Sequence, residues 1–329
     1  MRQALFILTS PFQILNAIEA YYYYNIDNAK YLFVTDNVSM SRDQMIELAH
    51  EFAIKYEIIE NTNLRLGNIY SLFYLIKHLI FSREIFKYNY TFLGDALENQ
   101  LNIWCSLRTC YGGKIIYLDD GSTSLNLLNN GVRLRGFFKL LYNIVCSAMK
   151  IEKYHMFTSY YRNPTDKFKV VSNNFSIMSK YMGNYQVDDC IYIVGTAVDE
   201  FCGYIGIDIN LYLVKLDALF SELKRTSSER IVYVPHRRDN NKEVIKLCSK
   251  NRIDYEHLDV AIEIFFCKHK KCPKKIYGFG SSALHNLKML FPKSQITNIL
   301  LEGSNIKGVN EYKNIGEFYQ GEDIELLTL

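Results

Sequence analysis

Short apolar runs alternate with longer amphipathic segments along the first half of the chain. The short runs predict strands at residues 4–9, 31–35, 57–60, 90–93 and 114–118. The longer segments between them predict helices at residues 11–24, 41–52, 68–81 and 98–111. Strands that alternate with helices in this order are typical of a parallel sheet with crossover helices.

The second half repeats this alternation after a polar, irregular stretch that contains Asn163-Pro164. Strands are predicted at residues 190–194, 230–235, 254–258, 275–279 and 295–300, and helices at residues 211–224, 242–250, 261–267 and 283–290. We therefore predict an α/β protein with two Rossmann-like domains that face a cleft. The predicted domains are residues 1–160 and 190–329, joined by a linker at residues 161–189. The last helix is expected to pack back on the N-terminal domain.

The composition fits two ordinary globular domains. A chain of 329 residues is long for a single core, and 49% hydrophobic with 22% charged residues excludes a disordered protein. The net charge of +3 is too small to favour nucleic acid as a partner. The sequence shows no signal-peptide pattern and no apolar run of about 18 residues. Its eight cysteines show no C-x-x-C or zinc spacing, so we expect a cytoplasmic protein with reduced thiols and no bound metal.

Basic residues gather in two stretches of the chain. One covers residues 268–275, and the other covers residues 133–153 and includes the apolar sequence around Phe137-Phe138. Both stretches are consistent with solvated surface. Lys and Arg beside apolar residues also suit anionic lipid, so peripheral contact with the inner membrane is the alternative interpretation.

A pair of carboxylates follows the predicted strand at residues 114–118, in the sequence Asp119-Asp120-Gly121. Ligands bind at the carboxyl ends of the strands in open α/β sheets. Burying two adjacent carboxylates in the core would cost a large desolvation free energy, so at least one of them is expected to face a cleft. A carboxylate in that position is a candidate general base.

A second candidate element is the turn Gly280-Ser281-Ser282, which ends a predicted strand and opens a predicted helix. Glycine permits a tight turn, and the helix that follows presents free N–H groups and the positive end of its dipole. This arrangement can bind an anion such as phosphate. Serine is also a preferred N-cap, so a purely structural role is the alternative.

Two further polar elements lie between these features in the second half. Pro235-His236-Arg237 ends a predicted strand and sets a histidine beside a cation, which favours a phosphate site; a structural histidine is the alternative. Glu263 is a lone carboxylate in an apolar run, so it needs a partner or a cleft. A ribose diol or a structural Arg or Lys would satisfy it. The interval from His236 to Glu263 and the interval from Glu263 to Ser281 each have the length of one strand–helix crossing. This spacing would bring the three elements to one edge of one sheet.

Together, these elements are what a nucleotide-sugar donor site requires. The sequence has neither a P-loop nor a G-x-G-x-x-G element, which weakens the ATPase and dinucleotide interpretations. It also lacks an Asp-x-Asp triplet, which argues against a donor diphosphate bridged by a metal. The contiguous Asp119-Asp120 pair would point to opposite sides of a strand.

These residues resemble the bacterial sialyltransferases of the two-domain (GT-B) glycosyltransferase fold. That family carries an acidic-acidic-Gly motif, matched here by Asp119-Asp120-Gly121, and a Ser-Ser motif, matched by Ser281-Ser282. His236 takes the place of its His-Pro motif, although here the proline, Pro235, comes first. The start of the chain, through Thr9 to Gln13, is similar to the Thr-Pro-Leu-Gln start of lipooligosaccharide sialyltransferases.

The resemblance implies an inverting, metal-independent transfer of sialic acid from CMP-sialic acid. Asp120 would be the general base and Asp119 and Gly121 would support it. His236 would assist the departing CMP phosphate. The remaining donor contacts would come from Pro235, Arg237, Glu263 at the ribose, Gly280, Ser281 and Ser282.

The acceptor implied by the resemblance is a glycan or glycolipid of a bacterial surface polysaccharide or lipooligosaccharide. We place acceptor contacts at Gln13, Gly94, Asp95 and Asn99, since the loop after the predicted strand at 90–93 lies at the same sheet edge. An N-cap role for Asp95 is the alternative. Two other functions stay open: another GT-B glycosyltransferase, such as one that uses CMP-Kdo, and a non-catalytic nucleotide- or glycan-binding module.

Overall fold

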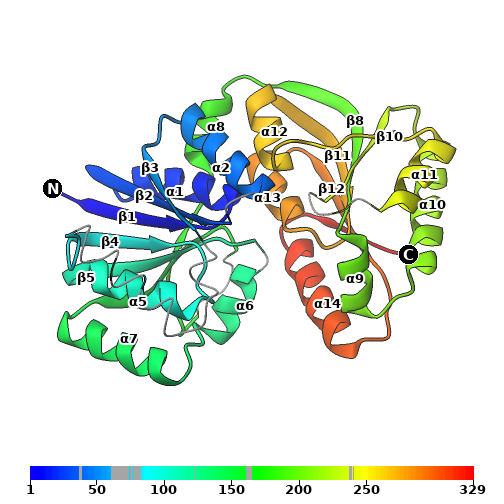
Figure 1. The fold of residues 1–329 in the computed structure, drawn as a ribbon. Coiled ribbons are helices and arrows are strands. Elements are labelled where there is room, and N and C mark those ends of the chain that lie inside the picture. The colour runs from blue at the N-terminus through cyan, green and yellow to red at the C-terminus, as the bar shows by residue number, and fades with distance from the viewer. Residues whose placement is uncertain are drawn as a thin grey trace. The chain divides into compact units, whose positions relative to one another are not determined.

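In the computed structural model, the chain folds into two compact units (Figure 1). The boundary falls between Met178 and Ser179. The structure describes residues 1–36, 39–60, 74, 77, 83–121, 123–160, 165–236, 239 and 241–329. Met1–Met178 form unit 1 and Ser179–Leu329 form unit 2. None of the helices in these ranges is long and apolar enough to cross a membrane.

Unit 1 is built on a seven-stranded sheet with the order β3-β2-β1-β4-β5-β6-β7. All of its strand pairs are parallel. The strands are β1 (Gln3–Leu8), β2 (Asn28–Thr35), β3 (Tyr56–Glu60), β4 (Tyr88–Leu93), β5 (Thr109–Leu118), β6 (Glu152–Thr158) and β7 (Lys169–Ser172). The chain winds outward from β1 to β3 and then from β4 to β7. The order therefore reverses beside β1, where β4 pairs with it, and ligands of open α/β sheets bind at such a switch point.

Helices cover both faces of this sheet, with α1 and α2 on one side and α5 and α7 on the other (Figure 1). They are α1 (Pro11–Tyr23), α2 (Met40–Glu51), α5 (Asn99–Arg108), α6 (Thr123–Asn130), α7 (Gly136–Ala148) and α8 (Ser176–Met182). Pro11 occupies the first turn of α1, where its missing N–H costs nothing. The Ser39 side chain caps α2 by accepting a hydrogen bond from Arg42 N.

Unit 2 has a six-stranded parallel sheet with the order β10-β9-β8-β11-β12-β13. Its strands are β8 (Gln186–Val194), β9 (Ile231–Val234), β10 (Asp254–Tyr255), β11 (Lys271–Gly278), β12 (Gln295–Leu300) and β13 (Glu325–Thr328). Its helices are α9 (Val198–Ile205), α10 (Ile209–Thr226), α11 (Lys242–Asn251), α12 (Ile262–His269), α13 (Ser282–Leu290) and α14 (Ile306–Gln320). One core cluster joins α9 and α10 to the sheet through residues such as Tyr212, Phe220 and Tyr233.

The predicted fold class is confirmed, since each half of the chain forms a parallel sheet with interleaved helices. The helix predicted at 98–111 ends at Arg108, because Thr109 takes extended backbone and pairs with Tyr88. The predicted helix at 68–81 lies outside the described residues, apart from Tyr74 and Lys77. Residues 161–189, predicted as a linker, contribute β7, α8 and the start of β8. The last helix, α14, packs within its own unit against α9, β12 and β13.

Candidate functional site

Three strand ends carry the candidate residues of unit 1. β1, β4 and β5 are neighbours in the sheet, and because they are parallel their carboxyl ends meet at one edge. Thr9 follows β1, Gly94 follows β4 and Asp119 follows β5. The predicted acidic pair and the predicted acceptor residue Gln13 are thereby brought together.

Asp119 is fully buried and holds two strand ends together. Its Oδ1 accepts a hydrogen bond from Thr158 Oγ1, at the end of β6. Its Oδ2 accepts bonds from Ser159 N at 2.7 Å and Ser159 Oγ at 3.0 Å. Desolvation of the buried carboxyl raises its pKa to about 6, although these hydrogen bonds oppose the rise. Asp119 therefore acts as a brace between β5 and β6.

Asp120 lies on the other side of the chain and is partly exposed. Gln13 Nε2 donates a hydrogen bond of 2.8 Å to Asp120 Oδ1. The backbone N–H of Asp120 donates to Ser124 Oγ at 3.1 Å, which anchors the start of α6. A carboxylate that is held by an amide and still reaches solvent can accept a proton from a bound hydroxyl.

Gln13 is itself fixed, because its Oε1 accepts hydrogen bonds from Thr9 N at 2.7 Å and Thr9 Oγ1 at 3.2 Å. Its side chain is completely buried. It also fills the space beside Gly94, where a Cβ atom would lie only 1.9 Å from Gln13 Oε1. The glycine after β4 is thus a steric requirement for the Gln13–Asp120 contact.

The other residues predicted in unit 1 have local partners. Gly121 has φ +60, a conformation that favours glycine, and its carbonyl accepts a bond from Ser124 N. Asp95 Oδ1 accepts a hydrogen bond from Leu97 N at 3.0 Å, and burial raises the pKa of its carboxyl. Asn99 Oδ1 accepts a bond from Arg135 N at 3.3 Å. Asp95 therefore shapes the loop between β4 and α5, and Asn99 ties the start of α5 to the segment before α7.

In unit 2, the turn after β11 is held rigidly. Gly280 has φ +63, and a Cβ there would lie 2.1 Å from Tyr312 Cε2. Its N–H donates to Asn298 Oδ1 at 2.8 Å, and Tyr319 OH donates to the Ser281 carbonyl at 3.0 Å. Ser281 is the N-cap of α13, with its hydroxyl accepting from Ala283 N. The capping role given as the alternative is present, and Ser282 opens the first turn of the helix.

Glu263 lies in the first turn of α12 and is buried. Its Oε1 accepts a hydrogen bond of 2.8 Å from Asn286 Nδ2 on α13. This bond joins the start of α12 to the middle of α13, and the two helices pack on each other. Asn286 is thus one partner of this carboxylate.

His236 follows β9 and is partly exposed, whereas Pro235 is buried. The His236 carbonyl accepts a bond from Asp239 N at 2.7 Å, which turns the chain back after the strand. Asp239 is also buried and accepts a bond from Val198 N at the start of α9, and burial raises the pKa of its carboxyl. Arg237 lies outside the described residues.

Several site residues escaped the sequence interpretation. Asn298 and Asn286 hold the Ser281 turn and Glu263, but polar residues inside a strand or helix pattern give no local signal of such roles. Gly195, directly after β8, was detectable because it is a glycine at a strand end. A Cβ at this position would lie 2.3 Å from Tyr233 OH, so glycine is required directly after β8 as well.

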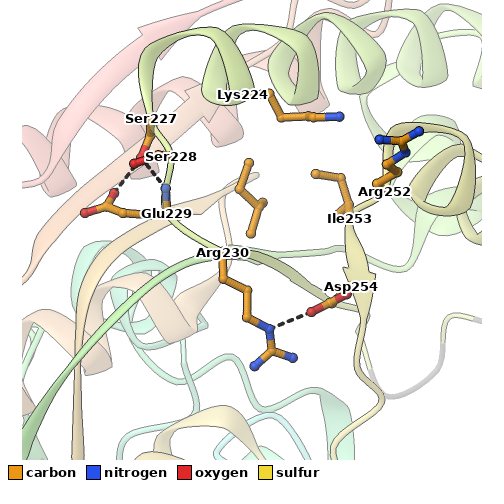
Figure 2. A pocket seen from close by; sticks show the side chains of 9 residues that line it. Lys224, Ser227, Ser228, Glu229, Arg230, Arg252, Ile253 and Asp254 are labelled. Carbon is orange, nitrogen blue, oxygen red and sulfur yellow. Dashed lines mark hydrogen bonds and ion pairs between the residues drawn. The ribbon is translucent and has the colours of Figure 1, made fainter.

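Two pockets lie at the opposite sheet edges, where strands begin. One, of about 280 Å³, is lined by residues before β9 and β10 (Figure 2). There Arg230 Nε donates to Asp254 Oδ2 at 2.5 Å, and Ser227 Oγ donates to Glu229 Oε2 at 2.8 Å. The other, of about 390 Å³, adjoins the start of β2 in unit 1. Neither pocket contains a residue of the candidate site.

Within the described ranges, no group of three His, Cys, Asp or Glu side chains is placed to hold a metal ion. The cysteines in these ranges are all free thiols.

Comparison with known proteins identifies the fold. No family model matches the chain, and no curated protein matches its sequence. Its structure is similar to an α/β-galactoside α-2,3-sialyltransferase from the luminous marine bacterium Photobacterium phosphoreum, with a TM-score of 0.54 and 10% identity, over 99% of this chain and 98% of the other. It is also similar to the GT-B domain of a sialyltransferase from Photobacterium damselae, with a TM-score of 0.52 and 10% identity, over the whole of both chains. The chain thus has the GT-B fold, with two Rossmann-like domains.

Proposed function

We propose that this protein is a sialyltransferase that transfers sialic acid from CMP-sialic acid to a hydroxyl of a bacterial surface glycan. The observation that carries the proposal is the difference in environment between the two adjacent carboxylates. Asp119 is buried as a brace, and Asp120 is partly exposed and held by Gln13 Nε2 at 2.8 Å. A GT-B fold with a positioned carboxylate at the end of a central strand supports a glycosyltransferase.

In the proposed reaction, Asp120 removes the proton of the acceptor hydroxyl while the oxygen attacks the anomeric carbon of sialic acid. The bond from that carbon to the CMP phosphate oxygen breaks at the opposite face, so the configuration inverts. The electron pair leaves with the phosphate, and His236 neutralises or protonates it. Gln13 keeps the Asp120 carboxylate in one orientation, which reduces the entropy cost of the proton transfer.

The donor site is assigned to unit 2. The N-terminus of α13, with Ser281 and Ser282, would hold the phosphate. Its geometry is fixed by the bonds from Gly280 N to Asn298 and from Tyr319 to the Ser281 carbonyl. Glu263, fixed by Asn286, would hold the CMP ribose. A monophosphate leaving group needs less charge neutralisation than a diphosphate, so a histidine and helix amides take the place of a metal ion in this proposal.

The acceptor is assigned to unit 1, beside Asp120. Gln13 and Gly94 lie next to the carboxylate. Asp95 shapes the adjoining loop, and Asn99 ties the start of α5 to Arg135. The proposed acceptor is a galactoside of a lipooligosaccharide or surface polysaccharide. Its delivery on a lipid would require contact with the cytoplasmic face of the inner membrane.

The first test is release of CMP from CMP-sialic acid by the pure protein, with an acceptor and with or without EDTA. We expect release in both conditions. Asp120→Asn should lower turnover roughly 10²- to 10⁴-fold, as loss of a general base does, and should retain affinity for CMP. Ser282→Ala should weaken CMP binding. Asp166→Asn, at an exposed carboxylate of unit 1, is the matched control and should behave as wild type.

Each other outcome has a defined meaning. Near-normal turnover of Asp120→Asn would refute the base assignment. Loss of activity in EDTA that a divalent metal restores would refute the metal-independent mechanism. Release from CMP-Kdo alone would assign the protein to a different donor, and CMP binding without release from any donor would show a binding module.

A further inference from the structure

Helix α7 of unit 1 has apolar side chains on two opposite faces. Phe138, Tyr142 and Cys146 are buried against the unit, and Tyr142 OH lies 3.2 Å from Tyr117 OH of β5. On the other face, Phe137, Leu140 and Ile144 are 62%, 59% and 56% exposed. A helix that merely packs on a protein needs only the first of these faces.

The exposed apolar residues form one continuous stripe. At 3.6 residues per turn, positions 137, 140, 141, 144 and 148 fall within roughly 100° of the helix circumference. All five are apolar: Phe137, Leu140, Leu141, Ile144 and Ala148. Single exposed apolar residues are ordinary, whereas a stripe along about three turns indicates a surface that something covers. Figure 1 shows α7 at the outside of its unit, on the far side of α5 from the sheet.

The charged residues of the α7 segment itself all have one sign. Arg133 and Arg135 precede α7, Lys139 lies within it and Lys150 follows it, and all four are exposed. The sequence from 121 to 151 contains no Asp or Glu. Beside the end of the helix, exposed Tyr111 lies under Lys150, whose Nζ is 5.4 Å from the ring centroid. Aromatic and basic side chains at the edge of an apolar surface are typical of lipid interfaces.

We propose that α7 is the surface by which this protein binds anionic lipid bilayers. The helix would lie in the plane of the membrane, with Phe137, Leu140 and Ile144 among the acyl chains and the flanking Arg133, Arg135 and Lys150 at the headgroup phosphates. A second copy of the chain fits this face less well. Paired α7 helices would place basic residues near one another, with no carboxylate between 121 and 151 to neutralise them.

This inference goes beyond the proposed transfer reaction and does not depend on it. The basic charge and the amphipathic geometry of α7 alone favour an anionic lipid. The membrane surface therefore has to be tested by binding, and the reaction has to be measured separately with a soluble acceptor.

The experiment measures cosedimentation of the full chain with vesicles of phosphatidylcholine, with and without phosphatidylglycerol. Wild type should bind the anionic vesicles at least tenfold more tightly than the neutral ones, and salt should weaken this binding. The double variant Leu140→Gln with Ile144→Gln should lose binding at least tenfold, and so should Arg133→Glu with Arg135→Glu. Glutamine keeps a high helix propensity, and both apolar positions are exposed, so α7 should stay folded.

The matched control is Leu211→Gln with Val214→Gln on α10 of unit 2, where the two side chains are 46% and 62% exposed. It should bind vesicles as wild type does. Equal binding of wild type to both vesicle types, or equal loss in the α10 control, would overturn the proposal. A dimer in solution that the α7 variant converts to monomer would assign the stripe to a second copy. CMP release with a soluble acceptor should be unchanged in the α7 variants, which separates this test from that of the proposed function.

Discussion

Adjacent identical residues acquire different properties at the end of β5. Successive side chains of an extended chain point to opposite sides, so Asp119 enters the protein while Asp120 turns toward Gln13. Burial raises the pKa of Asp119 and uses its oxygens for Thr158 and Ser159. Because Asp119 fixes the strand end, the partly exposed Asp120 has little freedom to move.

Gln13 is predicted to be a positioning residue for Asp120, and Gln13→Glu tests this assignment. Glutamate has the same volume and still accepts the two hydrogen bonds from Thr9. It cannot donate to Asp120 Oδ1, and it places a second carboxylate where the amide now lies at 2.8 Å. We therefore expect kcat to fall roughly ten- to hundredfold, with little change in the KM for the donor. Steady-state CMP release measures both constants.

The control for this variant is Gln320→Glu, which adds the same charge at an exposed position at the end of α14. It should leave kcat unchanged. A thermal unfolding curve should show a lower midpoint for Gln13→Glu, because a buried carboxylate beside Asp120 is costly, but the variant should stay folded at the assay temperature. A large drop in the midpoint, with kcat falling only in proportion to folded protein, would show that Gln13 has a structural role alone.

At the scale of elements, glycines set how closely strand ends and helices approach. Gly94 lets α1 bring Gln13 to the end of β4, and Gly280 lets α14 bring Tyr312 to the end of β11. Both lie directly after a strand or one residue later, in the turns that carry the candidate site. The geometry of the site thus depends on positions that have no side chain.

Gly280→Ala is predicted to destabilise unit 2. Its backbone has φ +63, which costs a residue with a Cβ about 1–2 kcal/mol, and the new methyl would lie 2.1 Å from the Tyr312 ring. Tyr312 is buried and its OH donates to the Ile299 carbonyl, so the ring cannot move away freely. We expect a loss of about 2 kcal/mol or more in the free energy of unfolding, measured by far-UV circular dichroism in urea, together with weaker CMP binding.

Gly203→Ala in α9 is the matched control for this substitution. Its Cβ would meet no atom within 4 Å, and its φ is ordinary. Alanine in a helix interior should be neutral or stabilise by about 0.5 kcal/mol. Equal stability of the two variants would contradict the steric account of Gly280.

For the whole molecule, the alternation of apolar runs with amphipathic segments was sufficient to predict two α/β units and every strand from β1 to β5. Buried parallel strands are continuous apolar runs, which stand out in a sequence. β6 did not stand out, because Glu152, Lys153 and His155 interrupt its apolar residues. Helix α7 was interpreted only as a basic-apolar stretch, since apolar residues on two faces blur the 3.6-residue period.

The candidate site was predictable in its motifs and unpredictable in its contacts. The strand-end positions of Asp120, His236 and Ser281 follow from local pattern. The bond from Gln13 to Asp120 joins residues 107 apart, and the bond from Asn286 to Glu263 joins residues 23 apart. Such pairs form only when the sheet order sets the elements side by side, and no local pattern contains that order.

The buried carboxyl of Asp119 makes the stability of unit 1 depend on pH. Its folded pKa is about 6, above the ordinary value of 3.8. Between these values the native state holds a proton that the unfolded chain has released, so stability falls as pH rises. The contribution is fully present below about pH 4 and is lost as pH passes through 6. At 1.36 kcal/mol per pKa unit, the whole change is roughly 3 kcal/mol.

Asp119→Asn should remove this pH dependence. The asparagine oxygen can accept from Ser159, and its amide can donate to Thr158 Oγ1, so the brace between β5 and β6 is retained. Urea unfolding followed by fluorescence isolates unit 1, because the only tryptophan of the chain, Trp104, is buried in α5. Relative to the variant, wild type should lose stability between pH 4 and 6 and change little from pH 7 to 8. A constant difference across this range would show that Asp119 stays ionised in the folded protein, held by its hydrogen-bond donors.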